Sequence, residues 1–265
     1  MSPKGRPEGE SAPQRVSAEG SPVHARLAAV ALCCAALAAP VDAAAQAPRV
    51  TPFSQGVPGT MPPPGWAAQT FPRIASHTRY ALVRDGDTVV VRAEADASAS
   101  GLVHRLAAPA AEARVLRWRW KVDRLPQGAD TSRKAADDAP ARVYVTFRHD
   151  PARLGPVDRL LYEAARVLYG EAPPHASLMY VWDAAGPAGR SFANPFTSRV
   201  QTIVVEGGRA RLGQWLAYER DILADYRAAF GEDPPPVSGV AIMTDADNTG
   251  DRASAWFGDV SLDGK

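Results

Sequence analysis

The stretch VAIMTDADNTGDRASAWFGDV, residues 240–260, decides the fold. An apolar run leads into a dense cluster of Asp, Asn, Thr and Gly, and a second apolar run leads out of it. Apolar runs that flank such a polar cluster are typical of two strands joined by a loop. Because the loop holds more carboxylates and small oxygen donors than a turn needs, we expect the functional site here.

Strand signals recur through the rest of the chain. Residues 80–83 and 88–93 flank an Asp-Gly pair, which is a hairpin signal. In residues 115–122 the side chains alternate, with Leu116, Trp118, Trp120 and Val122 on one face and Arg117, Arg119 and Lys121 on the other. Further strands are expected at 142–147, 178–182, 199–205, 237–244 and 256–262.

Two stretches favour helix, residues 157–168 and 218–230. The second places Ile222, Tyr226 and Phe230 on one stripe and stops at Gly231. A fold of alternating strands and helices would need helices between most strands, and these are absent. The sequence therefore predicts an all-β dominated fold, an antiparallel β-sandwich of jelly-roll type with two peripheral helices.

The N-terminal region has the composition of an export signal. An uninterrupted apolar run, residues 27–39, is followed by Ala43-Ala44-Ala45, a small-residue cleavage signature. We expect a signal peptide with a long leader at 1–45, a Pro-rich linker at 46–69 and a single sandwich domain at 70–265. The long leader suggests an alternative start near Val23. The predicted location is the periplasm or the secreted fraction, with no transmembrane anchor after cleavage.

Composition limits the partners and the chemistry. The 265-residue chain has a formal net charge of +1, which gives no general attraction to nucleic acid. Both cysteines, Cys33 and Cys34, lie in the segment expected to be removed, so the mature chain has neither a disulfide nor a thiol nucleophile. No paired histidines at zinc spacing and no G-x-S-x-G motif occur, which leaves zinc hydrolases and esterases without support.

Several segments together resemble a known family. The first half includes residues 78–95, 116–122 and 142–145, and the second half includes residues 180–182, Trp215 and the 245–250 loop with 255–260. They resemble a bacterial family of exported proteins, number 3047 in the domain-of-unknown-function series, over roughly residues 70–262. The resemblance implies a periplasmic or secreted β-rich protein, and it implies no activity.

The 245–251 loop matches the opening of a calcium-binding loop. Asp245, Asp247 and Asn248 supply the oxygen ligands that Ca²⁺ prefers. The twelfth position, where an EF-hand needs a bidentate Glu, is Trp256, and the flanks are strands, so an EF-hand is excluded. An Asx-turn, in which these side chains bond their own backbone, explains the same residues.

Three carboxylates are the candidates for acid/base catalysis. Asp138 precedes a strand, and across a sandwich it could approach Asp245 or Asp247. A pair of carboxylates at suitable spacing is how many glycosidases work. A structural ion pair of Asp138 with Arg142 or Arg119 is the alternative.

Polar strand faces supply the candidate ligand-binding residues. Arg119 and Lys121 share one face, and Arg142 and Tyr144 share a face of another strand. If the two faces coincide, they form a surface suited to an anionic or hydroxyl-rich ligand. Solvent-facing side chains are the alternative. Trp182 flanks a polar loop and is a candidate stacking platform, with a core position as its alternative.

The absence of a recognised catalytic motif favours binding. The first hypothesis is an exported, non-enzymatic β-sandwich that binds a carbohydrate or another cell-envelope ligand. The second is a glycan-cleaving hydrolase or lyase that uses Asp carboxylates. The third is an envelope assembly or scaffold protein, whose partner is another protein.

Overall fold

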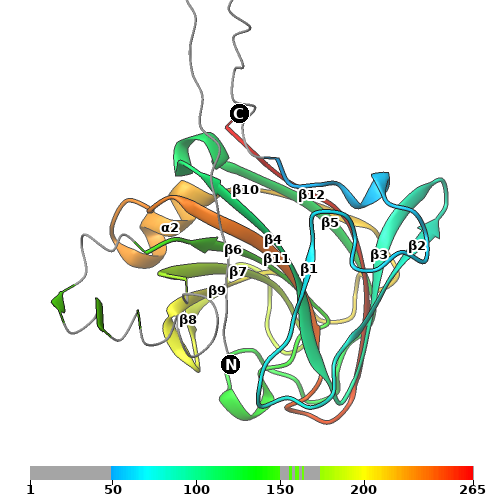
Figure 1. Cartoon of the computed structure of the whole chain (residues 1–265). Coiled ribbons are helices and arrows are strands. Elements are labelled where there is room, and N and C mark those ends of the chain that lie inside the picture. Colours follow the sequence, from blue (N-terminus) through cyan, green and yellow to red (C-terminus); the bar gives the residue numbers. More distant parts are fainter. Residues whose placement is uncertain (1–48, 150–154, 157–158, 161–162, 164–173, 265) are drawn as a thin grey trace, which may run out of the picture. The chain divides into compact units, whose positions relative to one another are not determined.

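The computed structural model describes residues 49–149, 155–156, 159–160, 163 and 174–264. About half of these residues form β-strands (Figure 1). The strands are β1 (Ala67–Gln69), β2 (Arg79–Asp85), β3 (Thr88–Asp96), β4 (Ala99–Ala108), β5 (Val115–Arg124), β6 (Ala141–Phe147), β7 (Ala176–Asp183), β8 (Ser191–Asn194), β9 (Thr197–Gly207), β10 (Leu216–Asp221), β11 (Val237–Asp245) and β12 (Arg252–Asp263). Three 3-10 turns, η1 (Phe53–Gln55), η2 (Ala110–Ala113) and η3 (Lys134–Ala136), and the helix α2 (Ile222–Phe230) complete the described elements.

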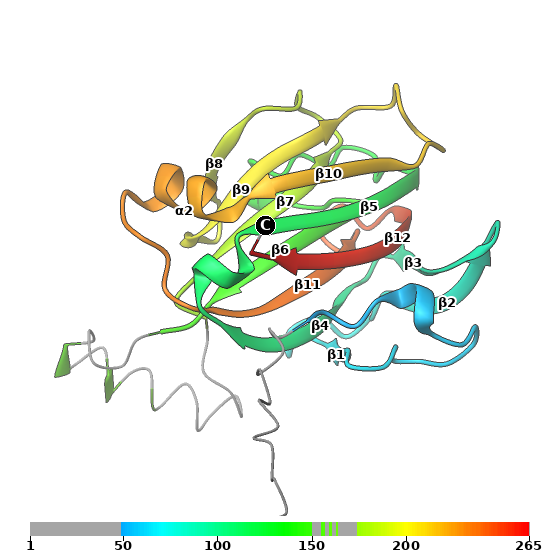
Figure 2. The same cartoon turned by 90° about the horizontal axis from the view of Figure 1, so that it is seen from above.

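The strands form two sheets that pack face to face (Figure 2). The seven-stranded sheet has the order β1-β4-β11-β6-β7-β9-β8, and the five-stranded sheet has the order β10-β5-β12-β3-β2. The prediction of a mostly β, two-sheet sandwich is therefore confirmed, while its jelly-roll type stays a prediction. The expectation of purely antiparallel pairing was wrong, because β7 and β9 run parallel. Strand β8 lies between them in sequence and forms the edge of the sheet, and the chain then turns back so that β9 lies between β7 and β8.

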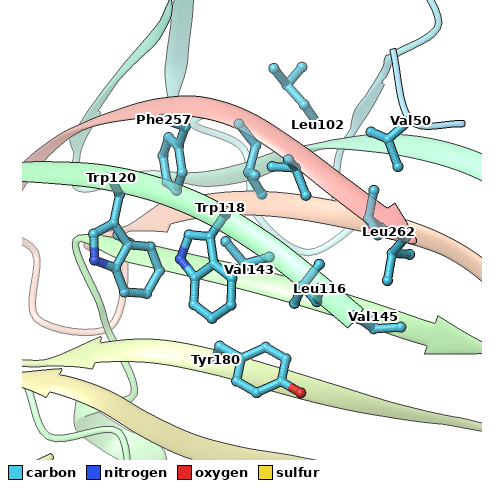
Figure 3. Close-up of a cluster of buried hydrophobic side chains, with 14 of the residues drawn as sticks. Val50, Leu102, Leu116, Trp118, Trp120, Val143, Val145, Tyr180, Phe257 and Leu262 are labelled. Carbon is cyan, nitrogen blue, oxygen red and sulfur yellow. The ribbon is translucent and has the colours of Figure 1, made fainter. Parts of the chain in front are cut away.

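The core lies between the inward faces of the two sheets. The alternation predicted for β5 is confirmed, since Leu116, Trp118, Trp120 and Val122 are all buried. Figure 3 shows Trp118 and Trp120 pointing from β5 toward the strand that carries Tyr180. The rings of Trp118 and Tyr180, from opposite sheets, have centroids 5.2 Å apart. These aromatic contacts join the sheets and leave the alternate side chains of each strand on the outward faces.

The predicted hairpin of β2 and β3 is confirmed. Asp85 pairs with Thr88, so Gly86 and Asp87 form a two-residue turn. Gly86 has a φ of 61°, which this tight turn requires and which glycine adopts without strain. Strands β1, β4, β8 and β10 were not predicted.

The predicted helix at 218–230 begins later than expected. Tyr218 to Asp221 belong to β10, where Tyr218 pairs with Trp118. Asp221 then caps α2, because its carboxylate accepts from the amides of Leu223 and Ala224. The buried stripe of Ile222 and Tyr226 packs on the sandwich, as the periodicity predicted. Most of the helix predicted at 157–168 lies outside the described residues.

The Pro-rich stretch packs against the domain where it is described. Val50 and Phe53 are buried in the main core, and Trp66 donates to the carbonyl of Thr51. From Arg49 onward, the residues of the linker expected at 46–69 are thus packed against the sandwich and form part of the domain. The predicted signal peptide lies outside the described residues. Within the described part of the chain, no helix has the length and apolar character needed to cross a membrane.

Candidate functional site

A cavity of about 770 Å³ lies on the outward face of the seven-stranded sheet. Its floor consists of outward side chains from four neighbouring strands: Arg142 and Tyr144 of β6, Met179 of β7, Val200 of β9 and Met243 of β11. Its walls come from loops, namely residues 71–74 before β2, the turn at 194–196 and residues 245–248 after β11. The cavity therefore has an apolar body and a polar end.

Arg142 organises the polar end. Its Nε and Nη2 atoms donate to the two carboxylate oxygens of Asp245, each at 2.8 Å. Nη2 also donates to the backbone carbonyl of Asp137 at 2.7 Å and to its carboxylate at 3.0 Å. Burial alone lowers the pKa of Arg142, but the carboxylates of Asp245 and Asp137 outweigh burial and hold that pKa well above its usual value. The guanidinium is thus a permanent cation, 2% exposed, beneath the cavity.

Asp138 fixes the loop that follows β11. Its carboxylate accepts from the backbone amide of Asn248 at 3.1 Å and from that of Thr249 at 2.6 Å. Asp138 is completely buried, so these two amides replace the water that would otherwise solvate its charge. This contact holds Asp247 and Asn248 at the cavity wall.

The carboxylates of Asp138, Asp245 and Asp247 lie close together. One oxygen from each is within 4.8 Å of the others. Burial raises the pKa of Asp245 to about 7, although Arg142 limits the rise. Burial and the charge of Asp138 also raise the pKa of Asp247. The polar end therefore gathers several carboxyl groups around the Arg142 guanidinium, while Arg73 also lines the cavity, and Asp247 is the carboxylate nearest to solvent.

Three polar groups at the cavity keep hydrogen-bonding capacity beyond their contacts with other described residues. The Nη1 atom of Arg142 donates to the thioether sulfur of Met179 at 3.2 Å, and the Arg142 side chain also interacts with the Tyr144 hydroxyl. The Tyr144 hydroxyl lies 3.8 Å from the Met243 sulfur. The Asp247 carboxylate accepts from its own backbone amide. Since sulfur is a weak acceptor, one donor, one hydroxyl and one carboxylate are available to a ligand.

The family model described as "Protein of unknown function (DUF3047)" matches residues 64–261. The chain belongs to this family. The predicted resemblance is therefore confirmed, while the bacterial and exported character of this DUF3047 chain stays a prediction. Comparison with curated proteins gives no match.

Among solved structures, the DUF3047 chain is similar to the family 11 carbohydrate-binding module of the cellulosomal cellulase Lic26A-Cel5E of Clostridium thermocellum. The two share 8% sequence identity with a TM-score of 0.40, and the match covers 82% of this chain and 95% of that module. At this score the similarity carries no weight for function.

The two predicted ligand-binding faces do not coincide. Arg119 and Lys121 lie on the outward face of β5 in the five-stranded sheet, whereas Arg142 and Tyr144 lie on that of β6 in the other sheet. The two faces point away from each other across the core. The single surface expected from these four residues is therefore wrong, and only Arg142 and Tyr144 line the cavity.

Arg119 and Lys121 take part in a separate layer on the five-stranded sheet. Lys121 donates to Asp85 at 2.6 Å, and its Nζ lies 5.2 Å from the Trp215 ring centroid and 4.8 Å from that of Trp256. The Arg119 guanidinium lies 4.7 Å from the Trp215 centroid. These contacts satisfy both cations within the domain.

Trp182 is not a stacking platform. It is completely buried, its ring lies 6.5 Å from that of Trp120, and its indole N–H donates to the carbonyl of Gly208. The core alternative therefore holds for this tryptophan, because an inward position on a sandwich strand keeps it away from any ligand.

The three catalytic candidates are brought together, but two of them are already occupied. Asp245 accepts from Arg142 and from the amide of Ala139, and Asp138 accepts from two loop amides. The predicted ion pair of Asp138 with Arg142 or Arg119 is not formed, since Asp137 and Asp245 pair with Arg142 instead. Asp247 is the candidate that a ligand can reach.

The predicted calcium ligands are only partly assembled. Asp245 and Asp247 lie together with Asp138, which the calcium motif did not include. Asn248 instead donates from its side-chain amide to the carbonyl of Lys134. Calcium binding stays a prediction, and the guanidinium of Arg142 supplies a positive charge to the same carboxylates.

The sequence reasoning missed the apolar residues of the cavity. Met179, Met243 and Val200 occupy outward positions of strands that were read as core, and Phe71 and Phe196 lie in loops. Phe196 follows Asn194-Pro195, a turn signal, so an aromatic residue in a predicted turn was the signal that the sequence offered; the structure shows it 53% exposed.

The raised pKa values predict that stability falls as pH rises. Between about pH 4, the pKa of an aspartate in an unfolded chain, and pH 7, folded Asp245 retains a proton that the unfolded chain has lost. The free energy of unfolding should therefore decrease over this interval, by at most about 1.4 kcal/mol per pH unit from this one group. Below about pH 4 Asp245 is protonated in both the folded and the unfolded chain, so the free energy of unfolding no longer depends on pH through this group.

Urea unfolding at several pH values between 4 and 8 measures this slope. Several other carboxylates have lowered pKa values: Asp85, Asp130, Asp221 and Asp251. Their contribution to the free energy of unfolding grows as pH rises toward about 4 and is nearly constant above it, so they do not mask the slope. Asp247 also has a raised pKa and adds to the same fall in stability, so the Asp247→Asn variant should lose less stability per pH unit. Asp123→Asn, at an exposed position of β5, should not change this slope. Stability that rises between pH 5 and 7 would contradict the prediction.

Proposed function

We propose that this protein is an exported β-sandwich of jelly-roll type that binds a carbohydrate of the cell envelope in the cavity on its seven-stranded sheet. The observation that carries the proposal is the combination of Arg142 Nη1, the Tyr144 hydroxyl and the Asp247 carboxylate in one cavity, each with hydrogen-bonding capacity left for a ligand. Buried polar groups are normally hydrogen-bonded, so these groups favour a ligand that offers both donors and acceptors.

The size and walls of the cavity agree with a short oligosaccharide. At about 770 Å³ it lies within the usual range of ligand pockets. Phe71 and Phe196 supply ring surfaces, which suit the apolar face of a sugar ring. Asn194 and Asn248 add amide groups at the rim, where hydroxyls of a sugar would be hydrogen-bonded.

The carboxylate geometry supports binding more than hydrolysis. Glycosidases hold two carboxyl groups either about 5–5.5 Å or about 6.5–9.5 Å apart, on either side of the scissile bond. Here Asp138 and Asp245 have oxygens within 4.8 Å, and both are almost fully buried and hydrogen-bonded by the protein. A substrate cannot lie between them.

Substitutions at the cavity test the proposal. Tyr144→Phe should weaken glycan binding about two- to tenfold, the value of one hydrogen bond. Phe196→Ala should weaken it by up to about tenfold through loss of ring contact. Phe196→Ala should leave the melting temperature nearly unchanged, because Phe196 is 53% exposed. Tyr144→Phe should lower it slightly, because the hydroxyl faces a sulfur but also interacts with Arg142.

The measurement is a glycan array with cell-wall fragments, followed by calorimetry on residues 46–265. Arg92→Ala is the matched control, because Arg92 lies on the outward face of the other sheet. Incubation with the same glycans and chromatography of the products detects any cleavage. The absence of glycan binding, or binding that both cavity variants leave unchanged, would refute the proposal.

A further inference from the structure

We infer that the cavity recognises an N-acetylated amino sugar and holds its acetamido group at the polar end. The inference rests on the proposed function and names the chemical class of its ligand. It is drawn from four features that lie together: a buried donor, a solvent-facing acceptor, two thioether side chains on the strands that flank β6, and a cluster of carboxyl groups.

The floor at the polar end is a continuous patch of four side chains. Met243 of β11 is the cross-strand neighbour of Arg142, and Met179 of β7 is the cross-strand neighbour of Tyr144. Directly opposed residues have Cβ atoms about 5 Å apart. Two methionine side chains therefore flank the arginine and the tyrosine, and their thioethers form a soft apolar surface that suits a methyl group.

Arg142 presents a donor to this surface. Asp245 and Asp137 use its Nε and Nη2 atoms, so its position is fixed by the protein. Nη1 lies 3.2 Å from the Met179 sulfur, and the guanidinium also interacts with the neutral Tyr144 hydroxyl. A guanidinium can only donate hydrogen bonds, and an amide carbonyl oxygen is a far better acceptor for it than a thioether sulfur.

Asp247 presents an acceptor on the other side. It lines the cavity, and one of its oxygens is within 4.8 Å of an Asp245 oxygen, which places it beside Arg142. A carboxylate accepts an amide N–H in a charge-assisted hydrogen bond. A secondary amide that carries a methyl group would therefore meet Nη1 with its oxygen, Asp247 with its N–H and the methionines with its methyl.

The charges argue against two related groups. A carboxylate on the ligand in this position would lie beside Asp245 and Asp247, which would repel it, although Arg142 pairs with Asp245 and Arg73 also lines the cavity. A free amine would satisfy Asp247 but would leave Nη1 without an acceptor and would face the guanidinium. Among the common substituents at the second carbon of a hexose, the neutral acetamido group fits all of these side chains.

Calorimetry with three trisaccharides tests the inference: the β-1,4-linked trimers of N-acetylglucosamine, glucosamine and glucose. The acetylated trimer should bind at least about tenfold more tightly than the other two. Asp247→Ala should weaken its binding about ten- to a hundredfold, the usual value of a hydrogen bond to a charged group, and should remove its advantage over the glucose trimer. Asp123→Ala, on β5 of the other sheet, should change neither value.

The outcomes separate this inference from the proposed function. Equal binding of the acetylated and glucose trimers, or an unchanged preference in Asp247→Ala, would overturn the inference and leave a glycan-binding cavity. Binding of other glycans without the acetylated trimer would also overturn it. The absence of binding to any glycan would overturn both. A loss of affinity in Asp247→Ala with an unchanged melting temperature would support it.

Discussion

Replacing Arg142 by methionine should destabilise the protein by about 3–5 kcal/mol, because removal of one partner leaves buried carboxylates without compensation. The side chains of Asp245 and Asp137, its partners, are only 4% and 6% exposed. Water cannot replace the lost guanidinium at such burial. The loss should be smaller near pH 5, where Asp245, with its pKa near 7, is largely protonated in the folded state.

Urea unfolding of the variant and of two controls measures this effect. Arg92→Met removes an exposed pair with Glu94, whose side chains are 44% and 36% exposed, and it should lose less than about 1 kcal/mol. The double variant Arg142→Met, Asp245→Asn should recover part of the stability, because one of the unpaired charges is gone. A loss below about 1 kcal/mol in Arg142→Met would show that the buried network contributes little.

Much of the fold could be predicted from periodicity. The alternation in β5 identified Trp118 and Trp120 as core and Arg119 and Lys121 as outward. A period of two settles which face of one strand is buried, because successive side chains point to opposite sides. It does not settle which sheet the strand joins. For that reason the sequence could not show that the polar face of β5 and that of β6 lie on opposite sides of the domain.

The candidate site could be predicted only where its residues are polar. The loop of Asp245 and Asp247 was found because carboxylates in a turn cluster stand out. The methionines of the floor were not found, because β7 is buried along its whole length and its outward residues look like core. Strands buried on both faces lose the alternation that marks an exposed face. Only the arrangement of the covering loops shows that Met179 borders a cavity.

Local propensity also misplaced one boundary. Tyr218 to Asp221 have helix-forming neighbours, but pairing with β5 makes them a strand. Tyr218 stacks on Trp118 with ring centroids 5.2 Å apart, a contact that a helix starting there would not make. Tertiary packing outweighs propensity, which amounts to less than about 1 kcal/mol per residue.

The second large effect is expected at the centre of the core, where Trp120→Ala should cost about 3–5 kcal/mol. Trp120 is completely buried, and its ring contacts those of Trp118, Trp182 and Tyr218. These neighbours are large rings held by both sheets, so they cannot close the space that the indole leaves. The result should be a cavity and a loss of contacts across the sandwich.

Two further variants show whether the stability lost in Trp120→Ala comes from the volume of the side chain, from its indole N–H or from its position in the core. The indole N–H of Trp120 makes no hydrogen bond of good geometry and only approaches the Tyr218 hydroxyl, so Trp120→Phe mainly loses volume and should cost only about 1 kcal/mol. Trp256→Ala, on the outward face of the same sheet, should cost less than Trp120→Ala, because its ring is only half-buried and packs against Lys121 and Arg92. Equal losses for Trp120→Ala and Trp256→Ala in urea unfolding would mean that the aromatic contacts between the sheets are not what stabilises the sandwich.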